Sequence, residues 1–176
     1  MQRIYVLLIL SVWLPFSAAS TTQGHGHVAM QGAILDTACA IAAGDADQSI
    51  SMGTLAVSEL VEKGYGPSVP LTVHLINCVL NETDVRGDFH WKDVRITFDG
   101  EADGHHRFAL QGEAHGEALV IADSRGVEAE PGESMPPLPI EPRDMSLHYR
   151  LWLTGDHKKI SPGHLNTTIR YFMEYD

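Results

Sequence analysis

Histidines are the side chains of this chain best suited to chemistry, and there are ten of them. His25 and His27 are two residues apart and would share one face of a β-strand, while His105 and His106 are adjacent. Imidazole suits zinc, copper or nickel. Because no acidic or thiol ligand stands at a telling spacing, the pattern favours a solvated or pH-responsive surface over a metal site.

The remaining polar residues form no recognisable catalytic group. The segment Asp123 to Gly126 contains a serine, but it lacks the features of a nucleophile elbow and favours a hairpin turn. Acidic pairs such as Glu128 and Glu130 are typical of a solvated face. We therefore expect no enzyme activity, no cofactor and no small-molecule substrate.

The chain has two cysteines, Cys39 and Cys78. In an exported protein a lone pair is more often bridged than free, and two cysteines without a CxxC motif do not make a zinc site. A disulfide between them would stabilise the fold by about 4 kcal/mol, before native strain is subtracted.

Export is indicated by residues 1–20. Arg3 precedes the apolar run Ile4 to Phe16, and small residues follow at 17–20. This order is typical of a cleaved signal peptide, with an uncleaved anchor as the alternative. The net charge of −11 and the lack of a basic stripe argue against nucleic acid or an anionic membrane as partner.

The elements that would position these residues are β-strands. Apolar and polar residues alternate in four stretches, at 71–76, 94–99, 145–153 and 165–175. The only helix-compatible stretch is Leu55 to Glu62. Residues 131–142 hold five prolines, so we expect a long loop or an edge crossover there. The pattern predicts an all-β sandwich in one domain.

Three features, taken in order, resemble the chaperone–usher pilin family. Residues 24–41 (GHGHVAMQGAILDTACAI) resemble a pilin N-terminus, with spaced glycines, a strand and the first cysteine. Residues 71–78 (LTVHLINC) resemble the strand that runs into the second cysteine. Gly163 and Tyr175 stand fourteenth and second from the end, with alternating apolar residues between them. The chain is most similar to subunits of P pili and type 1 pili.

This resemblance implies an incomplete immunoglobulin-like sandwich of six strands, whose seventh strand is supplied by another molecule. It divides the chain into a signal peptide (1–20), an N-terminal donor-strand extension (21–32) and a pilin domain (33–176). A sandwich without one edge strand exposes a groove of core side chains and unpaired backbone groups. In the family a periplasmic chaperone fills the groove first, and the extension of the next subunit then replaces the chaperone strand.

The resemblance also assigns residues to the two sides of this contact. The donor strand would use one face, with Val28 and Met30 as apolar anchors. That face comprises Gly24, Gly26, Val28, Met30 and Gly32. The acceptor groove and its subunit contacts would comprise Gly163, Leu165, Ile169, Tyr171, Met173 and Tyr175, with the carboxylate of Asp176 free to meet basic residues of the chaperone. The alternatives are an ordinary final core strand and a disordered N-terminal tail.

The function implied is that of a structural minor subunit of a fimbrium on the bacterial cell surface. Its partners would be a periplasmic chaperone, an outer-membrane usher and neighbouring subunits. Residues 94–100, 135–140 and 147–151 are most similar to the terminating, anchoring subunit of P pili, although that subunit has a longer N-terminal extension. The alternatives are a major shaft pilin and, from a different class, a self-complete periplasmic β-sandwich that binds a metal or another ligand.

Overall fold

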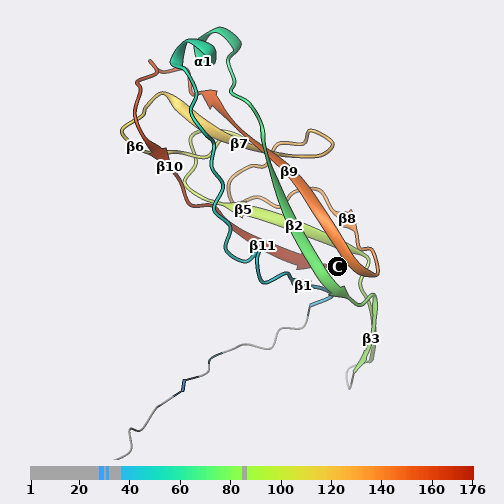
Figure 1. The fold of residues 1–176 in the computed structure, drawn as a ribbon. Coiled ribbons are helices and arrows are strands. Elements are labelled where there is room, and N and C mark those ends of the chain that lie inside the picture. The colour runs from blue at the N-terminus through green and yellow to red at the C-terminus, as the bar shows by residue number, and fades with distance from the viewer. Residues whose placement is uncertain (1–27, 30, 32–36, 85–86) are drawn as a thin grey trace, which may run out of the picture. The chain divides into compact units, whose positions relative to one another are not determined.

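The computed structural model describes residues 28–29, 31, 37–84 and 87–176. The chain divides into two units, Met1–Ile34 and Leu35–Asp176. Every described helix and strand belongs to the second unit (Figure 1). None of the described helices is long and apolar enough to cross a membrane.

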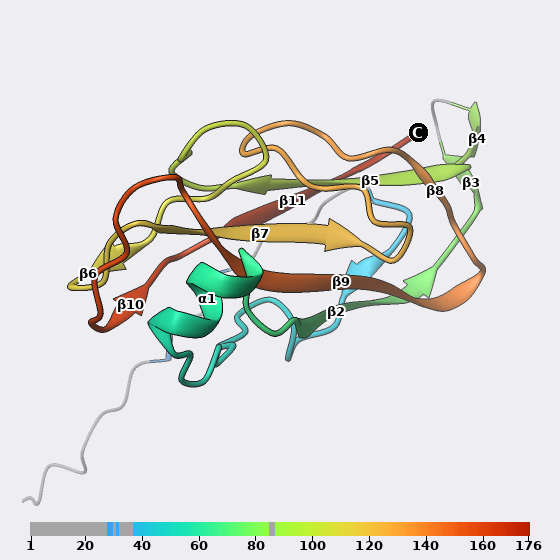
Figure 2. The same ribbon diagram turned by 90° about the horizontal axis from the view of Figure 1, so that it is seen from above.

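Two antiparallel β-sheets form the two layers of the second unit (Figure 2). The larger sheet has the order β1-β2-β9-β7, formed by β1 (Ala40–Ile41), β2 (Val69–Cys78), β9 (Arg143–Gly155) and β7 (Glu117–Asp123). The smaller sheet has the order β11-β5-β8, formed by β11 (Arg170–Tyr175), β5 (Asp93–Asp99) and β8 (Leu138–Pro139).

The remaining elements of the second unit are shorter. They are the pair β10 (Leu165–Asn166) and β6 (Gln111–Gly112), the hairpin β3 (Asn81–Asp84) and β4 (Gly87–His90), and the helix α1 (Val57–Lys63). The helix ends at Gly64, whose φ of 80° lies in the left-handed region that glycine adopts without steric cost.

Alternating apolar residues of three strands fill the space between the sheets. They are Leu71, Val73 and Leu75 of β2, Val94, Ile96 and Phe98 of β5, and Leu147, Tyr149, Leu151 and Leu153 of β9. The ring of Phe98 meets that of Tyr149 edge to face, with 5.0 Å between the centroids. The predicted all-β sandwich, with these three strands in their predicted phase, is confirmed.

The predicted interruptions of the strand pattern are also present. Of the proline-rich residues 131–142, only Leu138–Pro139 forms a strand, and this strand lies at the edge of the smaller sheet. The helix-compatible stretch forms α1. The segment Asp123 to Gly126 makes a hairpin turn, in which the Gly126 N–H donates to the Asp123 carbonyl at 3.0 Å.

Two elements of the structure, β7 and the hairpin β3–β4, are not predicted by the sequence pattern. All seven residues of β7 (EALVIAD) are buried, and its apolar run ALVIA is continuous and shows no period of two. The hairpin β3–β4 has a mostly polar sequence, NETD and GDFH, which resembles a loop.

A disulfide joins Cys39 and Cys78, as expected for a lone pair in an exported protein. It ties the chain just before β1 to the end of β2. The Val79 N–H donates to the Ala38 carbonyl at 2.8 Å beside this link. The first strand of the second unit is therefore fixed to the larger sheet at its start.

Candidate functional site

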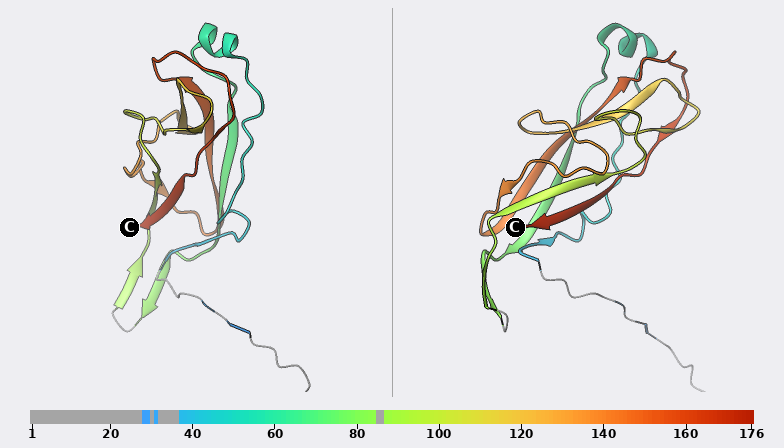
Figure 3. Two further views of the ribbon diagram at one scale, coloured as in Figure 1. Left: turned by 90° about the vertical axis from the view of Figure 1, so that its left-hand side faces the viewer. Right: turned by 180° about the vertical axis from the view of Figure 1, so that it is seen from behind.

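The C-terminal strand β11 is paired on one edge. It pairs with β5 along its whole length, with Tyr171 opposite Phe98 and Met173 opposite Ile96. Among the described residues no strand pairs with its other edge, along whose side the chain between β1 and α1 runs (Figure 3). An edge of this kind offers a row of N–H and C=O groups to an added strand.

The backbone groups on the open edge can be identified from the hydrogen bonds on the paired edge. The Asp176 N–H donates to the Asp93 carbonyl at 3.0 Å, and the Asp93 N–H donates back at 3.1 Å. Residues of an antiparallel strand face the two edges alternately. The backbone groups of Tyr171, Met173 and Tyr175 therefore face the open edge, and no other described residue hydrogen-bonds to them.

The side chains of the C-terminal run alternate between half-buried and exposed. The half-buried, core-facing members are Leu165, Ile169, Tyr171, Met173 and Tyr175. Phe172, on the opposite face of β11, is 51% exposed. The run forms two strands, β10 and β11, separated by residues 167–169.

A groove of about 850 Å³ lies beside this run. Its two walls are residues 46–57, which lead into the first residue of α1, and residues 160–169, which precede β11. Its floor consists of core side chains from both sheets, among them Leu71, Phe98, Leu119, Ile121 and Leu151. Of the predicted groove residues, Gly163, Leu165, Ile169 and Tyr171 line it, while Met173 and Tyr175 continue the same face of β11 beyond it.

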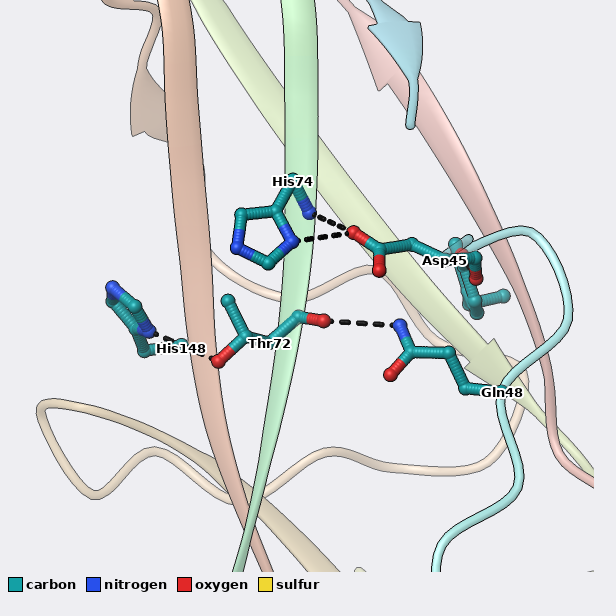
Figure 4. Close-up of polar contacts among 6 residues, drawn as sticks. Asp45, Gln48, Thr72, His74 and His148 are labelled. Carbon is teal, nitrogen blue, oxygen red and sulfur yellow. Dashed lines mark hydrogen bonds and ion pairs between the residues drawn. The ribbon is translucent and has the colours of Figure 1, made fainter. Parts of the chain in front are cut away.

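The wall that precedes α1 is held on β2 by side-chain hydrogen bonds (Figure 4). The Asp45 carboxylate lies 2.5 Å from the His74 backbone N and 2.7 Å from its Nδ1. Gln48 donates to the Thr72 carbonyl at 3.0 Å. The His74 backbone N–H is the main cause that holds the pKa of Asp45 below its ordinary value. These contacts fix the wall without a ladder of backbone bonds.

Two tyrosines of β11 reach the chain around β1. The Tyr171 hydroxyl donates to the Asp45 carbonyl at 2.5 Å, and the Tyr175 hydroxyl donates to the Cys39 carbonyl at 3.3 Å. Burial raises the pKa of both hydroxyls. The two layers are therefore joined by side chains alongside β11.

Gly163 occupies a place where a side chain does not fit. An added Cβ would lie 2.5 Å from the Ala114 backbone N and 2.7 Å from the Cβ of Glu113. The next residue, His164, accepts hydrogen bonds through its carbonyl from the N–H groups of Glu113 and Ala114, at 2.8 and 3.2 Å. Glycine lets these two backbone segments pack directly on each other.

Asp176 is engaged within the chain. Its side-chain carboxylate lies 2.8 Å from the Arg95 guanidinium, and its backbone oxygen accepts a hydrogen bond from the Lys92 N–H at 2.6 Å. Its contact with a chaperone stays a prediction. Among the predicted donor residues, Gly24, Gly26, Met30 and Gly32 lie outside the described residues, as do residues 1–20. Val28 is described and is 90% exposed.

Sequence reasoning missed one acidic residue of the groove, Glu117. It is the first residue of β7, in phase with Leu119 and Ile121, and all three line the groove. Glu117 is 7% exposed, and neither carboxylate oxygen has a hydrogen-bond partner among the described residues. Its signal in the sequence is an acid that opens the apolar run ALVIA.

The histidines make local contacts. His105 Nδ1 lies 2.8 Å from Glu130 Oε1, and His106 Nδ1 lies 3.7 Å from Oε2 of the same side chain. His25 and His27 lie outside the described residues. Within the described part of the chain, no three His, Cys, Asp or Glu side chains gather in a way that could hold a metal ion.

Comparison with known proteins identifies the family, although no family model matches the chain. The chain is 32% identical over 154 residues to the PAP fimbrial minor pilin protein of Escherichia coli, across 86% of this chain and 77% of that protein. It belongs to the fimbrial pilin family. This pilin is also 26% identical over 181 residues to the fimbria A protein of Serratia marcescens, across 99% of this chain and 98% of that protein.

Solved structures agree on the fold of this pilin. The P pilus rod subunit PapA has a TM-score of 0.68 at 20% identity, covering 80% of this chain and all of that one. A subunit from a chaperone–usher pilus has a TM-score of 0.71 at 22% identity, covering 90% of this chain and all of that one. The incomplete immunoglobulin-like sandwich of chaperone–usher pilins is thus confirmed. This pilin is an exported structural subunit of cell-surface fimbriae and not an enzyme.

Proposed function

We propose that this pilin is a minor subunit of a chaperone–usher fimbrium and that it is assembled by donor-strand exchange. In this mechanism an extended segment of a neighbouring subunit enters the groove and pairs with β11. The observation that carries the proposal is the open edge of β11 beside a groove floored by core side chains.

The entering strand would remove two unfavourable features of the isolated subunit. Its backbone would pair with the edge groups of Tyr171, Met173 and Tyr175, which have no partner among the described residues. Its inward side chains would cover the apolar floor of the groove. Each apolar anchor buried in this way contributes about 1.5–3 kcal/mol.

The N-terminal segment of this pilin would play the donor part in the adjoining subunit. We assign residues 1–20 to a signal peptide, residues 21–32 to the donor extension and residues 33–176 to the pilin domain. Val28 and Met30 would anchor the extension, and Gly24, Gly26 and Gly32 would lie on the same strand face.

A periplasmic chaperone would occupy the groove before assembly, and an outer-membrane usher would be the place of exchange. An open edge beside an apolar groove is an aggregation hazard for a free subunit, which is the physical reason for a chaperone. The chaperone would contact the same β11 edge and the region of Asp176.

Sequence identity to pilins of known role supports the minor role. The PAP and PRS minor pilins of Escherichia coli are each 32% identical to this chain, whereas the Pap major pilin is 28% identical over a shorter span of 116 residues. The narrower form of the proposal is the terminating, anchoring subunit. Incubating the chaperone complex with a donor-strand peptide distinguishes the roles, because a terminating subunit should resist exchange and a shaft pilin should exchange rapidly.

Expression with and without a chaperone tests the mechanism itself. The chain secreted alone should aggregate or be degraded, and co-secretion with the cognate chaperone should give a soluble one-to-one complex. Size-exclusion chromatography of periplasmic extracts measures both. A chain that is a stable soluble monomer when expressed alone would contradict the missing strand.

A further inference from the structure

Glu117 is a buried acidic residue of the groove to which the proposed assembly mechanism gives no role. It points to the same side of β7 as Leu119 and Ile121, which belong to the apolar core. The side chain is 93% buried, since 7% of its surface is exposed, and both carboxylate oxygens lack a hydrogen-bond partner among the described residues. An acid in this position calls for a partner.

No charged side chain among the described residues forms an ion pair with Glu117. Lys158 is 2.5 Å from Asp156 and 3.4 Å from Asp103, so its ammonium is already shared by two carboxylates. Burial, followed by the negative charge of Asp156, raises the pKa of Glu117, and His115 opposes the shift. The carboxyl of Glu117 is therefore held in an environment that suits neither its charge nor its hydrogen bonds.

The position of Glu117 in the groove determines which group could hydrogen-bond to its carboxyl. The groove lining around the start of β7 includes Ala114, Ile160, Ser161 and Pro162, and none of these side chains hydrogen-bonds to the Glu117 carboxylate. A strand that enters the groove brings a side chain toward the floor at every second residue. One of these inward positions would therefore face the Glu117 carboxyl.

We propose that Glu117 determines the specificity of the groove, by pairing with a cationic or hydrogen-bond-donating side chain on the entering segment of a neighbouring fimbrial subunit. The inference rests on the donor-strand exchange proposed above. An entirely apolar strand would bury Glu117 further and leave it unpaired, whereas a strand with a donor at the facing position satisfies it. The groove would discriminate between entering strands in two ways. A strand without a donor pays the cost of leaving the Glu117 carboxyl unpaired, and a strand with a donor gains a hydrogen bond to it.

Synthetic peptides that copy residues 21–32 of this chain serve as the probe. In one series each of the five positions 24, 26, 28, 30 and 32 carries Lys in turn, and in a matched series it carries Leu. The full chain in complex with its chaperone is incubated with each peptide. Native mass spectrometry measures the extent of chaperone displacement.

At one position the Lys peptide should exchange at least about tenfold better than the Leu peptide, because only the Lys side chain can form a charge-assisted hydrogen bond with Glu117. Glu117→Leu should reverse this preference, and Glu117→Gln should keep a weaker preference for Lys. Glu113→Gln, an exposed acid in the chain leading to β7, is the matched control and should behave as the wild type.

Exchange that favours Leu at all five positions, or a Lys preference that survives Glu117→Leu, would overturn the role of Glu117 and leave donor-strand exchange intact. Failure of every peptide to exchange into any variant would overturn the role of Glu117 in selecting an entering strand, and it would support the terminating form of the proposed function, whose groove resists exchange.

Discussion

Gly163 shows how a single residue shapes the wall of the groove. The sequence marks it by its distance from the end of the chain, but its physical role depends on residues about fifty positions earlier. The Ala114 backbone lies where a side chain of residue 163 would begin. No local sequence pattern predicts that contact, because it joins β10 to the chain between β6 and β7.

Gly163→Ala should destabilise the pilin domain. The new methyl group would lie 2.5 Å from the Ala114 N, so the two backbone segments must move apart, at a cost of about 1–3 kcal/mol. Gly44→Ala is the control, because no atom lies within 4 Å of its added Cβ. Thermal unfolding of the chaperone complexes measures the difference, and equal midpoints for the two variants would contradict the close contact.

Glu117 illustrates the opposite case, in which a residue stands out in the structure and not in the sequence. An acid at the start of an apolar run predicts a strand end, and a strand end is usually solvated. The burial of Glu117 follows from the cover given to β7 by β9 and by residues 155–164, which only the tertiary fold establishes.

Glu117→Leu should stabilise the pilin domain by about 1–3 kcal/mol near neutral pH, because it removes a buried carboxyl that has no partner among the described residues. The folded pKa of Glu117 is raised above 4.5, so the folded state binds its proton more tightly than the unfolded state does. The contribution of the Glu117 proton to stability is therefore complete below the unfolded pKa and is lost as the pH rises through the folded value. The advantage of the variant should shrink as the pH falls toward 4.5.

Urea unfolding of the wild type and of Glu117→Leu across this pH range measures the difference in the free energy of unfolding. Glu113→Gln, which alters an exposed acid, controls for the change in net charge. A difference that stays constant with pH would show that the Glu117 carboxyl is solvated in the folded state.

At the scale of elements, the period of two predicted the strands that lie between core and solvent. β2, β5 and β9 each bury alternate residues, so the alternation in their sequences indicates which face lies in the core. β7 is buried on both faces, so its sequence shows no alternation of apolar and polar residues. The hairpin β3–β4 was missed for a different reason, since polar strands have the composition of loops.

Proline substitutions in β11 should have different effects according to which edge of the strand loses its backbone N–H. The Met173 N–H faces the open edge, so Met173→Pro should remove a donor that an added strand needs while sparing the bonds to β5. Met173→Ala is the control for the lost side chain. The proline variant should exchange peptides several-fold more slowly than the alanine variant in the chaperone-displacement assay, with similar circular dichroism.

The same reasoning predicts that the neighbouring residue behaves differently. Phe172 has its backbone groups on the β5 side, opposite Thr97. Phe172→Pro should therefore disrupt the smaller sheet and lower the yield of folded complex. Similar exchange rates for Met173→Pro and Met173→Ala would indicate that the entering strand does not bond to the open edge of β11.

At the scale of the whole molecule, the described domain is a sandwich whose core is finished on one side only. β2, β5, β7 and β9 supply the floor, and the core-facing side chains of β10 and β11 are only half-buried because no strand among the described residues covers them. Cys39, Cys78 and Tyr175 each come from a different part of the chain that resembles pilins. They lie together, because the disulfide joins the two cysteines and the Tyr175 hydroxyl donates to the Cys39 carbonyl.

Covalent supply of the missing strand should make the domain self-sufficient. A second copy of residues 21–32, joined after Asp176 through a flexible glycine–serine linker, would keep the donor segment at a high effective concentration beside the groove. The fusion should be a soluble monomer without a chaperone, because the added strand pairs with β11 and covers the apolar floor.

Replacing both Val28 and Met30 equivalents of the added copy with Asp is the matched control. This control should return the protein to aggregation, since a charge cannot be buried without a partner. Analytical ultracentrifugation measures both forms, and equal solubility of the fusion and its Asp control would show that the groove does not take these anchors.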